Sequence, residues 1–368
     1  MNISASSAHR FLRFGFLASW TLACGSRSER SEMQPEGPLG VKVVDSVRLA
    51  ENDSVTLARP AGLVITADAI YVTDNATKQV SEFGRDGHLI RHFGRRGKGP
   101  GEFESVGAIV VVNDSLLAIK NLASASIDLF DRKTARFLRR VRVPSRLYDL
   151  VADNGHISGG AITADGRSSV FSFAAGDSSG AFTGIVPSIY QEYPILVGPF
   201  GTVTHDRRGG LLVEAFEASN FLFFTVASAS ADSINLPILR RKGAQTALLR
   251  KVAVDTARGK EALFGSSIPM HVRILNDSIV ALVHSDVTLD RNLFRGRYFL
   301  SLLDIRRYRV CLDIPLTLPT DPLPRIQIVG DTVFALVQHV SNDRYDGTYL
   351  VRYSIDQSVC PWNHVQKI

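Results

Sequence analysis

The sequence is poor in cysteine and lacks the motifs that most readily identify metal-dependent catalysis. Only three cysteines occur in 368 residues. Nine histidines are present, but none forms an HExxH pair or a His/Cys cluster with the spacing of a zinc site. Metalloproteases of the HExxH class are thereby excluded. No sequence motif identifies a reaction, so the fold is the most informative feature of the sequence.

The chain does contain enough apolar residues to build a large core. Hydrophobic residues make up 45% and charged residues 21%, which indicates a folded protein rather than a disordered one. The net charge of +6 arises from 42 basic and 36 acidic residues spread along the whole length. Nucleic-acid-binding proteins more often concentrate positive charge on one module, so we expect no nucleic-acid partner.

The first forty residues are predicted to be an export signal followed by a tether. Arg10 and Arg13 precede a short apolar stretch, residues 14–23, which ends at Cys24. Basic residues before a short apolar segment that ends in small residues are typical of a secretory signal. The stretch is too short to span a bilayer as a mature helix. Residues 25–40 are polar and include two prolines, as expected of a flexible tether.

Cys24 is a candidate lipidation site. The sequence Leu22-Ala23-Cys24 resembles the lipobox of bacterial lipoproteins, although Thr21 stands where that motif usually has leucine. The alternative is an ordinary signal peptide that is cleaved without lipidation. We expect an exported protein that is periplasmic or held at the membrane by a lipid anchor only. The predicted boundaries are a signal peptide at 1–24, a tether at 25–40 and a folded domain at 41–368.

One pattern recurs six times: a short apolar run, a turn that carries an aspartate, and a second apolar run. Asn-Asp and Gly-Asp pairs suit tight turns, and the flanking Val, Ile and Leu residues favour strands. Each copy is therefore predicted to be a β-hairpin. One aspartate per turn, far from the others, indicates a turn former rather than a calcium ligand. The six turn aspartates are Asp68, Asp114, Asp153, Asp206, Asp277 and Asp331.

These hairpins predict an all-β fold, a six-bladed β-propeller with four-stranded antiparallel blades. A third and usually a fourth strand follow each hairpin, so four strands recur about every 40–50 residues. Residues 41–49 have no hairpin of their own, and this N-terminal strand is predicted to close the last blade. Residues 243–268 predict a short helical insertion between blades 4 and 5. A pair of β-sandwiches would explain the strands but not six equivalent turns.

A glycine-rich stretch, HFGRRGKGPGEF at residues 92–103, follows the first unit. Together with residues 70–74 and 80–87 it resembles an NHL repeat, and more narrowly the bacterial six-bladed propeller lipoproteins of that superfamily. The resemblance is clear over residues 60–131. It implies that the stretch is a crossover from the outer strand of one blade to the inner strand of the next. A phosphate-binding P-loop is the alternative, but Lys98 is followed by glycine instead of Ser or Thr.

In a propeller, the crossovers and the loops between the second and third strands share one end of the ring. We expect polar residues on that end to form a binding rim at the mouth of the channel. A solvated loop face without a ligand is the alternative. The rim candidates are Arg95, Arg96, Lys98, Asp74, Asn121, His284, Asp286, His339, Asn342 and Arg344.

The predicted function is binding, by a monomeric, envelope-anchored propeller that holds a protein, peptide or glycan partner without a cofactor. Propellers carry many different functions, so the fold alone does not determine the function of this protein. The alternative, implied by metal-dependent relatives, is a hydrolase or lyase of the lactonase or amidating-lyase kind with calcium or another divalent ion in the channel. His284 and His339 follow the second strands of successive blades and could approach one another there. We nevertheless favour the interpretation that each is an ordinary rim or strand-end residue.

Cys311 and Cys360 are the two cysteines of the folded domain. Both are placed near the start of an outer strand in adjacent blades, which puts them at the same end of neighbouring sheets. Because disulfides persist in oxidising compartments, we predict a disulfide that pins the ring near its closure. Two buried free thiols are the alternative.

Overall fold

The computed structural model describes residues 41–52, 55–144, 147–153, 155–162, 168–185, 202–205, 211–215, 221–226, 231–235, 267–290, 293–318, 324–341 and 344–365. All of them belong to one compact unit, Glu36–Ile368. The predicted signal peptide, Cys24 and the tether lie outside the described residues, as do residues 243–266 of the predicted helical insertion. Its last two residues, 267 and 268, begin a strand.

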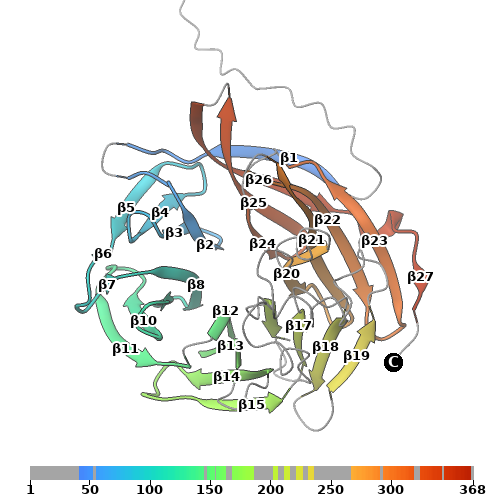
Figure 1. Ribbon diagram of the computed structural model, residues 1–368, viewed down its shortest axis with the longest axis horizontal. Coiled ribbons are helices and arrows are strands. Elements are labelled where there is room, and N and C mark those ends of the chain that lie inside the picture. The colour runs from blue at the N-terminus through green and yellow to red at the C-terminus, as the bar shows by residue number, and fades with distance from the viewer. Residues whose placement is uncertain are drawn as a thin grey trace, which may run out of the picture. The chain divides into compact units, whose positions relative to one another are not determined.

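The described residues form six antiparallel sheets arranged around a common centre (Figure 1). Five sheets have four strands each and the other has five, which confirms the predicted propeller with four-stranded blades. Blades 1 to 3 are β2 (Pro60–Ile65), β3 (Ala69–Asp74), β4 (Gln79–Gly84) and β5 (Leu89–Phe93); β8 (Val106–Asn113), β9 (Leu116–Asn121), β10 (Ser126–Asp131) and β11 (Phe137–Arg142); and β12 (Leu147–Asp153), β13 (His156–Ile162), β14 (Ser168–Ala174) and β15 (Ala181–Ile185).

The other three sheets include the two that contain strands from the chain ends. Blades 4 to 6 are β16 (Thr202–His205), β17 (Leu211–Ala215), β18 (Phe221–Val226) and β19 (Ala231–Asn235); β20 (Ser267–Ile274), β21 (Ile279–Asp290), β22 (Leu293–Asp304), β23 (Arg309–Leu316) and β27 (Asn363–His364); and β24 (Arg325–Val329), β25 (Thr332–Ser341), β26 (Arg344–Ile355) and β1 (Val41–Arg48).

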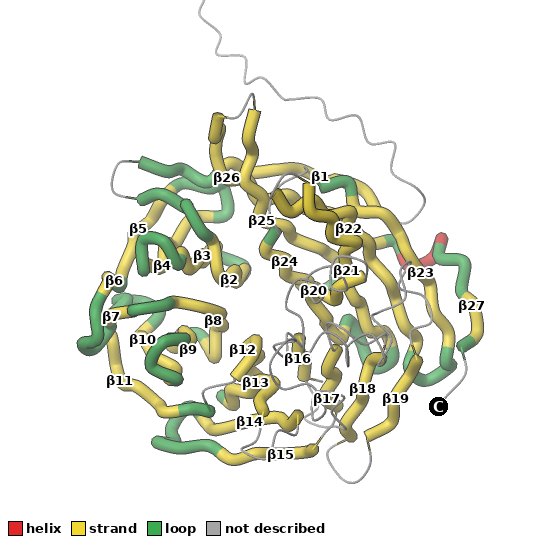
Figure 2. Tube along the Cα trace, in the orientation of Figure 1, coloured by secondary structure: helices red, strands yellow, loops and turns green. Residues whose placement is uncertain are grey.

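The first strand of each blade lies innermost, next to the centre of the ring (Figure 2). Each inner strand contacts the inner strands on both sides, from β2 through β8, β12, β16, β20 and β24 back to β2. Because a strand between two blades is covered on both faces, apolar residues run continuously along it. All six residues of β3 are buried, for example. The near-continuous apolar runs of the sequence are explained by this two-sided burial.

The hairpin turns are held by short polar side chains, as predicted, but in two blades the side chain that accepts the turn's backbone hydrogen bonds is the asparagine before the aspartate. Asn113 Oδ1 accepts a hydrogen bond from the Ser115 backbone N–H at 3.0 Å. Asn276 Oδ1 accepts from the backbone N–H groups of Ser278 and Ile279, also at 3.0 Å. The adjacent Asp114 and Asp277 side chains are exposed. These turns are Asx-turns, which need no metal.

The N-terminal strand closes the ring, which confirms the predicted clasp. β1 pairs antiparallel with β26, from Val41 opposite Ile355 to Arg48 opposite Tyr349. The chain then passes to blade 1, and Leu49 and Leu57 are buried in a cluster that joins blades 6 and 1. The outer edge of β26 is thereby covered by a strand from the other end of the chain.

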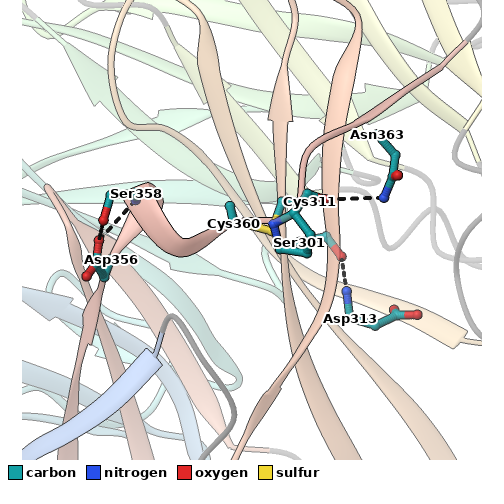
Figure 3. The surroundings of a disulfide bond; sticks show 8 residues. Ser301, Cys311, Asp313, Asp356, Ser358, Cys360 and Asn363 are labelled. Carbon is teal, nitrogen blue, oxygen red and sulfur yellow. Dashed lines mark hydrogen bonds between the residues drawn. A yellow bond between two sulfur atoms is a disulfide. The ribbon is translucent and has the colours of Figure 1, made fainter.

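Cys311 and Cys360 form the predicted disulfide, with their Cα atoms 5.7 Å apart (Figure 3). The predicted position of Cys360 was wrong, since the outer strand of blade 6 is β1. Cys360 instead follows a single 3-10 turn, η2 (Gln357–Val359), and precedes β27, which pairs with β23 as a fifth strand of blade 5. The disulfide thus fixes the C-terminal segment to blade 5. Within the described residues no helix is long and apolar enough to cross a membrane.

Candidate functional site

The glycine-rich stretch lies between blades 1 and 2 and is a crossover, as the sequence predicted. Two short segments within it, β6 (Arg95–Arg96) and β7 (Glu102–Phe103), pair in parallel. Gly94 and Gly101 have φ values of 79° and 73°, which glycine adopts without steric cost. The Phe103 side chain is fully buried and stacks on Phe130, with ring centroids 6.0 Å apart.

The anion that the crossover binds is one of its own carboxylates. Glu102 Oε2 accepts the Gly99 backbone N–H at 2.8 Å, and Glu102 Oε1 lies 2.7 Å from Arg95 Nη2. The Gly99 hydrogen bond and the Arg95 contact hold the pKa of Glu102 below its ordinary value of 4.5. A phosphate would have to displace this carboxylate, so the crossover interpretation fits better than a P-loop.

A buried ion pair anchors the same loop to blade 2. Arg140 Nε and Nη2 donate to the two carboxylate oxygens of Asp128 at 2.6 and 2.8 Å, and the Asp128 side chain is fully buried. The Arg140 guanidinium also donates to the carbonyl oxygens of Lys98, Gly99 and Glu102. Arg140, which the sequence analysis did not select, is therefore the residue that fixes the crossover.

Three predicted rim residues belong to this loop and lie away from the channel. β6 and β7 sit at the outer edge of the ring, near the outer strands β5 and β11 (Figure 2). The Arg95, Arg96 and Lys98 side chains are largely exposed there. Lys98 Nζ lies 3.4 Å from a Glu104 carboxylate oxygen. The structure therefore places these cations on the circumference and not at the mouth of the channel.

Asp74, Asn121 and Asp286 are buried in the blades instead of standing on a rim. Asp74 is 1% exposed, and its carboxylate accepts the backbone N–H groups of Ala76 and Thr77 at 2.9 Å, so it caps the turn after β3. Asn121 is also 1% exposed and donates from Nδ2 to the Glu102 carbonyl. Asp286 is buried in β21. Asp74 and Asn121 are the last residues of the second strands β3 and β9.

The two histidines considered for a channel metal are in different surroundings. His284 is completely buried, stacks on Phe299 and has Nε2 3.0 Å from Ser301 Oγ, so its predicted rim position was wrong. His339 is exposed on β25, with Nδ1 3.3 Å from an Asp346 carboxylate oxygen. Arg344 is exposed at the start of β26. Asn342 lies outside the described residues.

The channel itself holds the side chains that the sequence analysis missed. It encloses about 700 Å³ and is lined by segments of β2, β8, β12, β20 and β24. Most of the described lining residues are aliphatic, since the inner strands also form the blade cores. The charged or titratable residues among them are His271, Arg273, Asp277 and Arg325.

Arg325 begins the inner strand of blade 6, at the end of the channel where the inner strands start. Its Nε donates to the Pro60 carbonyl of blade 1 at 2.9 Å, and its side chain reaches solvent. The residue directly before Pro60 is Arg59, which is also exposed. Among the described residues no carboxylate lies within 4 Å of either guanidinium. Arg325 is the first residue of its inner strand and Arg59 directly precedes β2, a positional similarity that the sequence analysis did not use.

His271 lies deeper in the channel wall, on β20. It pairs with Val283, and Arg273 pairs with Ala281. Both β21 partners belong to the cluster shared with blade 6, so His271 and Arg273 are on the face of β20 that points towards that blade. Burial, and secondarily the Arg273 charge, lower the pKa of His271 to about 3, so its imidazole is neutral at pH 7. Its Nε2 has no hydrogen-bond partner among the described residues.

The geometry of the described residues supports neither a metal centre nor a serine nucleophile elbow. In the part of the chain that the structure describes, no three His, Cys, Asp or Glu side chains gather where they could hold a metal ion. The string Gly176-Asp-Ser-Ser-Gly180 matches a Gly-x-Ser-x-Gly nucleophile elbow by letter, which the sequence analysis overlooked. It forms the turn between strands β14 and β15, whereas the elbow requires a turn from a strand into a helix.

Comparison with known proteins supports the fold. The model of the DUF5128 family, described as a 6-bladed β-propeller, matches residues 42–154. No curated protein matches the chain. The matched segment spans the clasp strand, blades 1 and 2 and the start of blade 3, so the family description agrees with the six sheets observed.

Solved structures show the same architecture at low sequence identity. A member of the DUF4221 family from Bacteroides vulgatus has a TM-score of 0.63 at 9% identity, over 86% of this chain and 98% of that one. A candidate exported protein from Bacteroides fragilis has a TM-score of 0.55 at 13% identity, over 86% and 96%. Virginiamycin B lyase from Staphylococcus aureus reaches 0.45 at 12% identity, over 86% and 100%, which is too distant to bear on chemistry. These similarities establish a β-propeller and no particular function.

Proposed function

We propose that the protein is an exported, envelope-tethered binding protein whose central channel holds a ligand or an extended part of a protein, peptide or glycan partner. The observation that carries the proposal is the channel itself. Its volume of about 700 Å³ falls within the range of known ligand pockets, roughly 300–1,000 Å³. It is bounded by inner strands of five blades, and strands hold lining groups more rigidly than loops do.

The distribution of polar residues supports the channel over the outer loop face. Asp74 caps a turn, Asn121 donates to the Glu102 carbonyl, and Arg95 and Lys98 contact Glu102 and Glu104 of their own loop. Among the described residues Arg325 hydrogen-bonds a carbonyl group alone, and it reaches solvent at the channel entrance. A group already engaged within the fold has less to offer a ligand than one that is not.

Export is supported by two independent features. The N-terminal stretch that ends at Cys24 has the pattern of a secretory signal. The Cys311–Cys360 disulfide suits an oxidising compartment such as the periplasm. Together they favour a tethered position in the cell envelope.

The test is a thermal-shift screen of small metabolites, peptides and oligosaccharides against the full chain and against Ala61→Trp. Ala61 lines the channel, so the indole should obstruct it and abolish the stabilisation that any channel ligand gives. Ala123→Trp, at an exposed turn of blade 2, is the matched control and should retain it. Binding that survives Ala61→Trp with unchanged affinity would place the site elsewhere.

A further inference from the structure

Arg325 lines the channel near its entrance and Arg59 lies beside it, and neither guanidinium contacts a carboxylate among the described residues, although the Arg59 backbone N–H donates to Asp74. The Arg325 guanidinium has five N–H donors, and its only hydrogen bond to a described residue is from Nε to the Pro60 carbonyl. Arg59 precedes Pro60, so the hydrogen bond that positions Arg325 also brings it next to a second cation. Desolvation against the channel wall, and secondarily the Arg59 charge, lower the pKa of Arg325, which remains protonated near neutral pH.

The strand register shows that the two arginines belong to one junction. Arg325 pairs with Leu336 on β25, and Leu336 lies in the cluster that joins blades 6 and 1. The Arg325 side chain is therefore on the blade-1 side of β24. Gln327 is on the same side and accepts the Ile65 backbone N–H through Oε1 at 2.6 Å. The wall below Arg325 is thus fixed to β2 by a hydrogen bond, which keeps the junction rigid.

The rest of the described lining contains charges of both signs, Arg273 on β20 and Asp277 in the turn that follows it. His271 is neutral and adds no charge. The local excess of positive charge therefore comes from Arg59 and Arg325 at the entrance, and neighbouring cations concentrate counter-ions. Like charges placed side by side destabilise the unliganded protein, and an anion between them would relieve that repulsion.

We propose that Arg59 and Arg325 form an oxyanion-binding site at the channel entrance, and that the ligand is a small molecule bearing a carboxylate or phosphate group. The proposal rests on the proposed function and names the ligand class for the same channel. A guanidinium fork matches the two oxygens of either group.

The experiment is isothermal titration of the full chain with citrate and, separately, with inorganic phosphate. Wild type is compared with Arg325→Gln, Arg59→Gln and the matched control Arg96→Gln, which removes an exposed cation on the outer circumference. We expect at least one oxyanion to bind wild type. Loss of a charged hydrogen bond should weaken that binding roughly 10- to 100-fold in Arg325→Gln and Arg59→Gln. The control should stay within about twofold, and stronger binding of one probe identifies carboxylate or phosphate as the preferred group.

Absence of binding by both oxyanions, or equal loss in Arg325→Gln and Arg96→Gln, would overturn the oxyanion site. Thermal unfolding of each variant excludes loss of folding as the cause. The proposed function fails differently. A neutral ligand that Ala61→Trp blocks and Arg325→Gln does not would keep the channel as the binding site and reject its anion specificity.

Discussion

The junction between blades 1 and 2 and the junction between blades 6 and 1 both carry arginines, and they use them in opposite ways. At the first, Arg140 and Arg95 each meet a carboxylate, from Asp128 and Glu102. At the second, Arg325 meets a carbonyl group and no carboxylate among the described residues. The glycine-rich loop has the denser run of cations in the sequence, yet Arg95 and Lys98 contact carboxylates of their own loop. The number of basic residues in a stretch therefore says less about binding than the carboxylates that lie beside them.

The largest effect should come from breaking the first junction. Arg140→Met leaves the fully buried Asp128 carboxylate without its partner, which should cost about 3–5 kcal/mol of unfolding free energy. Urea denaturation followed by circular dichroism measures it. Arg325→Met is the comparison variant at the second junction and should change stability by no more than about 1 kcal/mol, because it removes one hydrogen bond to the Pro60 carbonyl and leaves no buried carboxylate unpaired.

A double variant separates the ion pair from the packing around it. Asp128→Leu combined with Arg140→Met removes both charges, so most of the loss seen in the single variant should be recovered. Equal stability losses in Arg140→Met and Arg325→Met would show that the two junctions do not differ as described.

The next effect concerns a third junction, between blades 5 and 6, which is closed by a covalent bond. Cys311 and Cys360 are separated by 49 residues. Replacing both with serine frees the denatured chain and should lower stability by about 2–4 kcal/mol. The change in urea midpoint relative to the matched variant Cys24→Ser, which leaves this bond intact, gives the measurement. Two free thiols in protein isolated from the periplasm would contradict the disulfide.

The smallest effect is a pH dependence at the first junction. The pKa of Glu102 is lowered in the folded protein, so its contribution to stability is present above pH 4.5 and is lost as the pH falls through the lowered pKa. Glu102→Gln should therefore be less stable than wild type at pH 7, with the difference shrinking on acidification. Thermal unfolding between pH 7 and the acid limit of solubility tests this. A difference that grows towards low pH would be inconsistent with the Gly99 and Arg95 contacts.

Much of the fold followed from the sequence because it depends on local chemistry repeated six times. Turns of the Asn-Asp type and apolar runs of strand length specify hairpins. The strand predicted at 41–49 had no hairpin of its own, so it had to complete a blade formed elsewhere in the chain. The return of the chain to blade 5 through β27 was not predicted, because a two-residue strand carries no periodicity. The helical insertion remains a prediction, since residues 243–266 lie outside the described residues.

The site was harder to predict than the fold because residue type does not reveal burial. His284 and Asp74 are polar and follow strands, which suggested a rim, yet both lie inside blades where they satisfy other polar groups. Arg325 belongs to no recognisable sequence motif. Its position at the start of an inner strand becomes informative only in the closed ring, where blade 6 lies beside blade 1. The burial of a polar side chain and its distance from other groups depend on which strands become neighbours in the closed ring.

The clasp also sets the order in which the protein can fold. β1 is the first strand to be synthesised, but its partner β26 comes almost at the end, and Arg48 donates to the Asp346 carbonyl across 298 residues. Contacts so distant in sequence form late and slowly. The ring therefore cannot close until the C-terminal part of the chain has been made.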